Sequence, residues 1–170
     1  MSEIKLKKPI NECYWVVPGK FLAGEFPGDF DDTFARGKIK SLIEFGVTDF
    51  IDLTEIDEGP LPYYSDLKDQ SYRRFPIRDG SIPDSLEKTK LILDTIDDLI
   101  SDGKLIYLHC WGGVGRTGLI VGCWLSRHGY KGEKALYRLH ELWQQRSKTS
   151  FRETPETEEQ AQYILNWHEQ

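Results

Sequence analysis

The sequence predicts an α/β fold in which helices flank a central, largely parallel sheet. Two observations carry this prediction: apolar segments of strand length alternate with segments of helical periodicity, and the apolar segment KLIYLHC (104–110) is too short for a helix. A short segment that is apolar throughout is typical of a strand covered on both faces. The 170 residues show no repeat, linker or break in composition, so we expect a single domain over residues 1–170.

Five segments are predicted to be strands because apolar, β-branched or aromatic residues are enriched in them and turn residues bound them. They are residues 13–17, 20–24, 48–54, 71–77 and 104–110. Pro18-Gly19 forms a turn between the first two strands, and the prolines of residues 55–66 make a loop after the third.

Five further segments are predicted to be helices from apolar residues at helical spacing. They are residues 29–46, 84–102, 117–128, 131–145 and a last helix opened by Thr154-Pro155. Asp84 and Glu87 resemble a capping box at the start of the second helix, and Pro155 is expected in the first turn of the last. One stripe of the second helix is expected to face the core. Its members are Leu86, Leu91, Ile92, Ile96, Leu99 and Ile100.

Charge and composition restrict the class of partner. The chain has 22 basic and 28 acidic residues, a net charge of -6, so no general positive field would attract nucleic acid or anionic lipid. Residues 1–10 lack the apolar core of a signal peptide, and no apolar run reaches the length of a membrane span. We therefore expect a cytoplasmic protein, and we expect it to be a monomer.

Three cysteines, Cys13, Cys110 and Cys123, cannot all pair within one chain. Their spacing matches no zinc pattern of the CxxC kind. At least one thiol is therefore expected to be free, which fits a reducing compartment.

One stretch, LIYLHCWGGVGRTGLIVGCWL (105–125), places a cysteine, glycines and an arginine between a predicted strand and a predicted helix. Three of its glycines permit a tight loop whose N–H groups point inward. They are Gly112, Gly113 and Gly115. These N–H groups and the positive end of the helix would cradle an anion, and Arg116 adds a planar fork for two phosphate oxygens. Cys110 at the base lies in the same field, which favours its thiolate form.

Two nucleotide-binding patterns are partly matched by the same stretch. Residues 113–118 fit GxGxxG, but a dinucleotide fold needs a further strand and an acidic residue about 20 residues on, where a second helix is predicted instead. The Walker pattern fails because Leu119 stands where its lysine must be. Both nucleotide-binding interpretations are therefore disfavoured.

The motif HCWGGVGRTG (109–118) resembles the HCx5R[ST] signature of the cysteine-based protein tyrosine phosphatase superfamily, in its dual-specificity branch. FIDLTE (50–55) and FPIRDGSIPD (75–84) are similar to segments that precede the signature in that branch. The loop and the PIxDGxxPD stretch look most like the kinase-associated phosphatase subgroup. The resemblance implies a protein tyrosine phosphatase-like fold and one phosphatase domain spanning the chain.

The resemblance also implies that Cys110 attacks phosphorus to form a phosphocysteine while Arg116 and the intervening loop bind the phosphate. The loop residues are Trp111, Gly112, Gly113, Val114 and Gly115. An aspartic acid on the preceding loop protonates the leaving oxygen and then serves as base for water. Asp79 is favoured because it sits where the family's Asp-x-x-x-Pro loop has its acid, whereas Asp84 is also explained as a helix N-cap.

Supporting roles follow from the same resemblance. Thr117 is expected to donate a hydrogen bond to the Cys110 sulfur, and its other expected role is at the helix N-terminus. His109 is expected to orient the loop, and the alternative is that it is a simple buried histidine. Gln160 is a weaker candidate for a contact with the attacking water. Cys13 and Cys123 are expected in the core, with a disulfide to Cys110 as the alternative. No metal or other cofactor is required, because Arg116 and the loop amides supply the charge stabilisation.

The predicted substrate is a phosphorylated protein or peptide. Trp111 and Val114 hold loop positions where members of the family that act on inositol phosphates tend to carry lysines. An apolar, aromatic rim favours phosphotyrosine over a polyanion, and a shallow site would also admit phosphoserine and phosphothreonine. A phosphatase of a small or lipid phosphate, such as an inositol phosphate or a phosphoinositide, remains an alternative. So does a phosphate-binding module without turnover.

Overall fold

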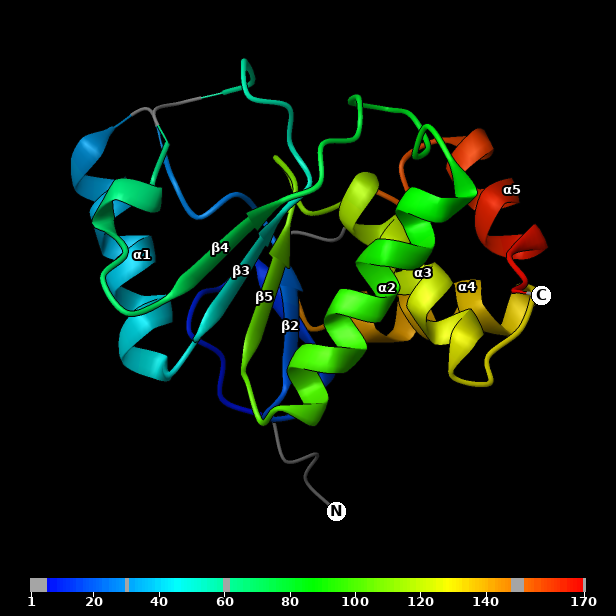
Figure 1. Ribbon diagram of the computed structural model, residues 1–170, viewed down its shortest axis with the longest axis horizontal. Coiled ribbons are helices and arrows are strands. Elements are labelled where there is room, and N and C mark those ends of the chain that lie inside the picture. The colour runs from blue at the N-terminus through cyan, green and yellow to red at the C-terminus, as the bar shows by residue number, and fades with distance from the viewer. Residues whose placement is uncertain (1–5, 30, 60–61, 148–151, 170) are drawn as a thin grey trace.

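A computed structural model describes residues 6–29, 31–59, 62–147 and 152–169 of the chain. Its strands are β1 (Cys13–Val17), β2 (Phe21–Gly24), β3 (Asp49–Asp52), β4 (Ser71–Arg74) and β5 (Ile106–His109). Its helices are α1 (Asp32–Phe45), α2 (Leu86–Ser101), α3 (Arg116–Arg127), α4 (Glu133–Trp143) and α5 (Glu158–Asn166), with a 3-10 turn at Tyr64–Asp66. The sheet lies between α1 on one side and the group α2 to α5 on the other (Figure 1).

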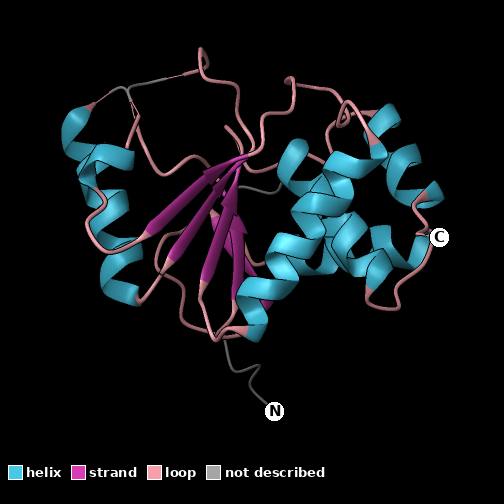
Figure 2. Cartoon of the chain, viewed as in Figure 1, coloured by secondary structure: helices cyan, strands magenta, loops and turns pink. Residues whose placement is uncertain are grey.

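The sheet is largely parallel, as predicted, and β5 is its central strand. The strand order is β1-β2-β5-β3-β4, in which only the pair β1-β2 is antiparallel. All four residues of β5 are buried, because a strand with neighbours on both sides and helices over both faces has no exposed surface. The arrowheads of the parallel strands converge at one edge of the sheet, and the long loops gather there (Figure 2).

Two apolar clusters fill the space on the two faces of the sheet. Side chains of β5 alternate between them, because successive residues of a strand point to opposite faces. Ile106 and Leu108 join the cluster beneath α2 to α5, and Tyr107 joins the cluster beneath α1. The strand that leads into the predicted site is therefore fixed from both sides. Among the described residues, no helix has the length and apolar character needed to cross a membrane.

The predicted start of α2 is wrong by one residue. Ser85, not Asp84, is the N-cap: its hydroxyl accepts a hydrogen bond from the Lys88 N–H at 3.1 Å. Asp84 is exposed and makes an ion pair with the Lys88 ammonium at 3.3 Å instead. The predicted apolar stripe is also too wide, because Leu86 and Leu91 lie on the solvent side of the helix, 63% and 55% exposed.

The predicted start of α5 is wrong as well. Pro155 follows a cis peptide bond after Thr154 and lies outside the helix, which begins at Glu158. A capping box begins the helix instead of Pro155. The Thr157 hydroxyl accepts a hydrogen bond from the Gln160 N–H, and the Gln160 side chain accepts one from the Thr157 N–H. The helix therefore starts where its first N–H groups find side-chain acceptors.

Two helical glycines provide a matched test of the packing between α3 and α5. A Cβ on Gly122 would lie 2.8 Å and 3.0 Å from Cγ1 and Cγ2 of buried Ile164, whereas a Cβ on Gly37 would meet nothing within 4 Å. We expect Gly122→Ala to lower the free energy of unfolding by ~1–3 kcal/mol through overpacking. Gly37→Ala should raise it by ~0.5–1 kcal/mol, because alanine favours the helix. Urea unfolding measures both, and equal effects of the two substitutions would contradict the packing described.

Candidate active site

The loop between β5 and α3 has the form that an anion site requires. Within the described part of the chain, the N–H groups of Gly112, Gly113, Val114 and Gly115 donate no hydrogen bond. Gly115 is also the N-cap of α3 and offers no side chain to its first turn. Unpartnered N–H groups at a loop and a helix N-terminus attract a negative charge. Cys110 lies at the start of this loop, 3% exposed.

Arg116 is buried in this loop, and its two Nη groups make three hydrogen bonds and one ion pair. Nη1 and Nη2 donate to the two oxygens of Glu58 at 2.7 and 2.8 Å. Nη1 also donates to the Ile77 carbonyl at 2.9 Å, and Nη2 lies 3.2 Å from the Asp79 carboxylate. Its Nε–H is buried and has no partner among the described residues. The buried guanidinium therefore has its Nε–H available to bind an anion.

Of the two candidate acids, only Asp79 is next to the arginine. The Asp79 side chain is 72% exposed and touches Arg116, whereas Asp84 pairs with Lys88 on α2. The loop that carries Asp79 is tied to α5 by two hydrogen bonds. The Gln160 amide donates to the Ser81 carbonyl at 3.0 Å, and the Thr157 hydroxyl donates to the Gly80 carbonyl at 3.4 Å.

Gln160 is therefore occupied as a link between α5 and the acid loop. It is fully buried, and its side-chain oxygen accepts from the Glu156 and Thr157 N–H groups. The sequence analysis expected Gln160 to contact the attacking water and did not predict this link. The oxygen of its side-chain amide binds the cap of α5, and the nitrogen binds the loop that carries Asp79.

His109 is buried behind Cys110 and holds the first peptide of the loop. Its Nδ1–H donates to the Cys110 carbonyl at 3.0 Å, and its Nε2 accepts from the Tyr63 hydroxyl at 2.5 Å. These partners assign the neutral tautomer with the proton on Nδ1. Complete burial lowers the pKa of His109, an effect that the Asp52 carboxylate at 3.8 Å only partly offsets. A neutral histidine fits the predicted orienting role.

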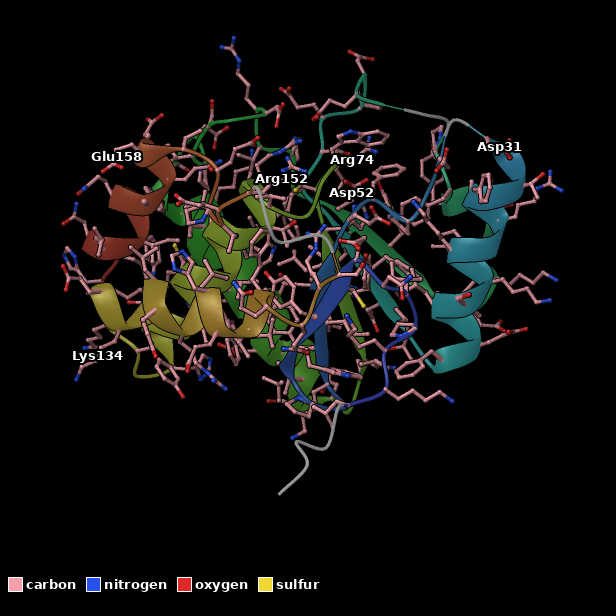
Figure 3. All side chains as sticks on the ribbon, turned by 180° about the vertical axis from the view of Figure 1, so that it is seen from behind. Asp31, Asp52, Arg74, Lys134, Arg152 and Glu158 are labelled. Carbon is pink, nitrogen blue, oxygen red and sulfur yellow. The ribbon has the colours of Figure 1, made fainter. Side chains whose placement is uncertain are left out.

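Asp52 extends this buried network under the site, at the end of β3. Its carboxylate accepts from the Thr54 N–H and hydroxyl at 2.8 and 2.6 Å, from the Tyr72 hydroxyl at 2.5 Å and from Arg74 at 3.1 Å. Asp52 and Arg74 lie together at the loop edge of the sheet (Figure 3). Burial alone would raise the pKa of Asp52, but His109 and the hydrogen bonds from Thr54 and Tyr72 outweigh it and lower the pKa.

Glu58 is the site residue that the sequence analysis missed. It lies in the loop 55–66, which carries no motif of its own, and its contact with Arg116 joins positions far apart in the sequence. Burial alone would raise the pKa of Glu58, but the hydrogen bonds from Arg116 and from the Glu55 N–H outweigh it and lower the pKa. A signal existed: a buried arginine needs a carboxylate partner, and the acidic loop after β3 could provide one.

The remaining predicted residues divide into rim and core. Trp111 is 40% exposed at the rim, and its ring packs against Phe26 at 5.4 Å between centroids. Val114 does not belong to the rim as predicted, because its side chain turns into the apolar cluster and is 1% exposed. Thr117 is fully buried, and its hydroxyl has no hydrogen-bond partner among the described residues, so the predicted hydrogen bond to the Cys110 sulfur is not present in this structure.

The other two cysteines lie in the core, as expected, and all three cysteines are free thiols. Burial raises the pKa of Cys13 to about 11 and raises that of Cys123. Both thiols therefore stay protonated at neutral pH, which makes them poor nucleophiles for exchange with Cys110.

The lowered pKa of Glu58 predicts a pH-dependent contribution to stability. Because the folded pKa is below the ordinary value of ~4.3, this contribution is complete above that value and is lost as the pH falls through the folded pKa. We expect Glu58→Gln to lower the free energy of unfolding by ~1–2 kcal/mol at pH 7, with the difference from wild type shrinking below pH ~4. Urea unfolding at a series of pH values measures this. Glu55→Gln, which removes an exposed charge from the same loop, is the control, and an equal pH dependence of both variants would contradict the pairing.

The chain resembles known proteins over most of its length. A family model described as "Polymorphic toxin system, DSP-PTPase phosphatase" matches residues 31–130. "Putative tyrosine phosphatase 067L" of Invertebrate iridescent virus 3 is 32% identical over 120 residues, which are 69% of this chain and 47% of that protein. The chain thus spans less than half the length of this viral relative. A plant protein, "Phosphatidylinositol 3,4,5-trisphosphate 3-phosphatase and protein-tyrosine-phosphatase PTEN1" of Arabidopsis thaliana, is 40% identical over 65 residues, 37% of this chain and 16% of that protein.

Solved structures share the fold at low sequence identity. The active form of Tk-PTP superimposes with a TM-score of 0.69 at 22% identity, covering 91% of this chain and 93% of that one. Kinase associated phosphatase, with serine in place of its catalytic cysteine, gives 0.64 at 17% identity, covering 85% and 83%. The fold is that of the protein tyrosine phosphatases. Since the family model covers more than half of the chain, the protein belongs to the DSP-PTPase phosphatase family of polymorphic toxin systems.

Proposed function

We propose that this protein is a phosphoric monoester hydrolase that removes phosphate from phosphotyrosine in proteins or peptides through a phosphocysteine intermediate. One observation carries the proposal: the Cys110 thiol opens a loop of unpartnered N–H groups, and the buried Arg116 of that loop touches Asp79. A nucleophile, an anion cradle and a proton donor are thereby within one site.

In the first step, the Cys110 sulfur attacks phosphorus and the bond from phosphorus to the ester oxygen breaks. The non-bridging oxygens are held by the loop N–H groups and by Arg116, whose free Nε–H is the first available donor. A phosphate oxygen also replaces the Asp79 carboxylate on Nη2, which the ion pair at 3.2 Å now occupies. Once released from the ion pair, Asp79 takes up a proton from solvent, and its carboxylic acid then gives that proton to the leaving tyrosine oxygen.

In the second step, water attacks the phosphocysteine, the S–P bond breaks and inorganic phosphate leaves. The Asp79 carboxylate takes the proton from water, and the thiolate of Cys110 is restored. The buried Thr117 hydroxyl, which has no partner among the described residues, is a donor available to the departing sulfur. His109 and Tyr63 keep the first peptide of the loop in place throughout both steps.

The rim of the site supports an aryl phosphate as substrate. Trp111 offers an exposed ring backed by Phe26, and aromatic rings pack well against a tyrosine side chain. Residues 111–115 contain no lysine that would match the additional phosphates of an inositol headgroup. The name of the viral relative, a tyrosine phosphatase, agrees with this choice. Three buried, unpaired thiols support the cytoplasm as the compartment.

Phosphate release tests the proposal with four substrates: an aryl phosphate, a phosphotyrosine peptide, a phosphothreonine peptide and a phosphoinositide. We expect the phosphotyrosine peptide to give the highest kcat/KM and Cys110→Ser to abolish turnover. Asp79→Asn should lower kcat by ~100- to 10,000-fold, because the leaving oxygen loses its acid. Asp84→Asn is the matched control, an aspartate of the same loop that does not touch Arg116, and it should retain wild-type activity.

The alternatives are outcomes of the same experiment. A preference for the phosphoinositide would show that the substrate is a lipid rather than a protein. Phosphate binding without turnover of any substrate would leave a binding module. Loss of activity in Asp84→Asn with full activity in Asp79→Asn would identify Asp84 rather than Asp79 as the acid.

A further inference from the structure

The carbonyl groups of the phosphate-binding loop have donors outside the loop. The Trp111 carbonyl accepts from the Phe26 N–H at 2.8 Å, and the Gly112 and Gly113 carbonyls accept from Nη1 of Arg146 at 3.0 and 3.2 Å. The Val114 carbonyl accepts from the Thr154 hydroxyl at 2.7 Å. Four successive carbonyls are thus held from outside.

This arrangement fixes the direction of the loop N–H groups. In a trans peptide, the carbonyl of one residue and the N–H of the next point in opposite directions. Carbonyls held outward at positions 112–114 therefore turn the N–H groups of Gly113, Val114 and Gly115 the other way. Those are the N–H groups that have no partner in the described part of the chain.

Arg146, which follows α4, is itself fixed in place. It is 7% exposed, and its Nε and Nη2 donate to the carboxylate of buried Glu12 at 3.1 and 3.0 Å. Glu12 also accepts from the Ser147 hydroxyl, and the guanidinium lies over the Trp143 ring at 5.7 Å. One edge of the guanidinium is thus bound to Glu12, which leaves Nη1 for the loop.

Thr154 is held as firmly. It is 1% exposed, and its own carbonyl accepts from Nε2 of His140 on α4 at 2.7 Å. A Cβ on Gly118 of α3 would collide with the Thr154 hydroxyl, so the first turn of α3 packs directly against this side chain. Segments far from the loop in the sequence therefore meet its outer face.

We propose that Arg146, Glu12 and Thr154, here named the outer clamp, are positioning residues for the phosphate-binding loop. This inference rests on the proposed function, since it concerns the site that binds the phosphate. Without the outer clamp, the peptides after Gly112, Gly113 and Val114 lose the partners of their carbonyls. A peptide that rotates then turns a carbonyl oxygen toward the phosphate and removes an N–H from it. The ion pair of Arg146 with Glu12 limits the net charge it adds, so the outer clamp acts through geometry.

The first test uses Thr154→Val and Thr154→Ser. Valine keeps the shape of threonine and removes the hydroxyl, whereas serine keeps the hydroxyl. We expect Thr154→Val to raise the Kd for orthovanadate, measured by calorimetry, and the KM for a phosphotyrosine peptide, each by about five- to tenfold. Thr154→Ser should restore most of the wild-type affinity, a rescue that a purely packing role would not give.

The second test uses Arg146→Lys, with Arg127→Lys as its matched control. Arg127 ends α3 and pairs with Asp94, Asp97 and Glu169, so its replacement disturbs an ion-pair network without touching the loop. A lysine at 146 keeps a charge for Glu12 but lacks the second edge that reaches the loop. We expect Arg146→Lys to weaken orthovanadate binding by about tenfold or more, and Arg127→Lys to leave it unchanged at a temperature where both variants are folded.

The binding measurement separates failure of this inference from failure of the proposed function. If wild type binds orthovanadate but hydrolyses no substrate, the proposed function is wrong, and the variants still test the outer clamp by their Kd values. If Thr154→Val and Arg146→Lys bind orthovanadate as wild type does, the outer clamp is not a positioning device. If wild type does not bind orthovanadate, both proposals are wrong.

Discussion

The site depends on the burial of one positive charge, the guanidinium of Arg116. A buried guanidinium is costly unless it is paired, and here Glu58 and the Ile77 carbonyl accept three hydrogen bonds from it while Asp79 adds an ion pair. These partners come from two segments, the loop after β3 and the connection between β4 and α2 that carries Asp79. The arginine thus gathers the loops at one edge of the sheet around the cysteine. The parallel sheet makes this possible, because the carboxyl ends of its strands lie together there.

Two sets of polar contacts hold the cysteine loop from behind and from outside. Behind it, His109 and Asp52 form a buried network with tyrosines and a threonine. Outside it, donors from distant segments meet the carbonyls. The carboxylate of Asp52, the His109 ring and the donors to the loop carbonyls are all hydrogen-bonded, so rearrangement of either set costs free energy. A loop rich in glycine, which has many accessible conformations by itself, is therefore restricted to one.

The sequence predicted the fold and the central motif because both are local. A strand, a glycine loop and a helix are adjacent in the chain, and Cys110 and Arg116 are six positions apart. Glu58 lies 58 positions from Arg116, and Glu12 lies 134 from Arg146. No local pattern identifies partners at such separations, since only the folded sheet brings them together.

The predicted starts of α2 and α5 were wrong for a different reason: several residues able to cap a helix stand close together, and tertiary contacts select among them. The prediction that Val114 lies at the rim was wrong because the curvature of the loop, which periodicity does not encode, turns its side chain inward.

The attachment of the acid loop to α5 bears on how Asp79 reaches a leaving group. Hydrogen bonds from Gln160 and Thr157 hold residues 80 and 81 against a capped helix, and Arg116 holds the Ile77 carbonyl on the other side of Asp79. The main chain on both sides of Asp79 is thus held without a substrate, and only the carboxylate has to leave Arg116. On the proposed function, the approach of this acid to the leaving oxygen then needs a rotation of one exposed side chain rather than a rearrangement of the loop.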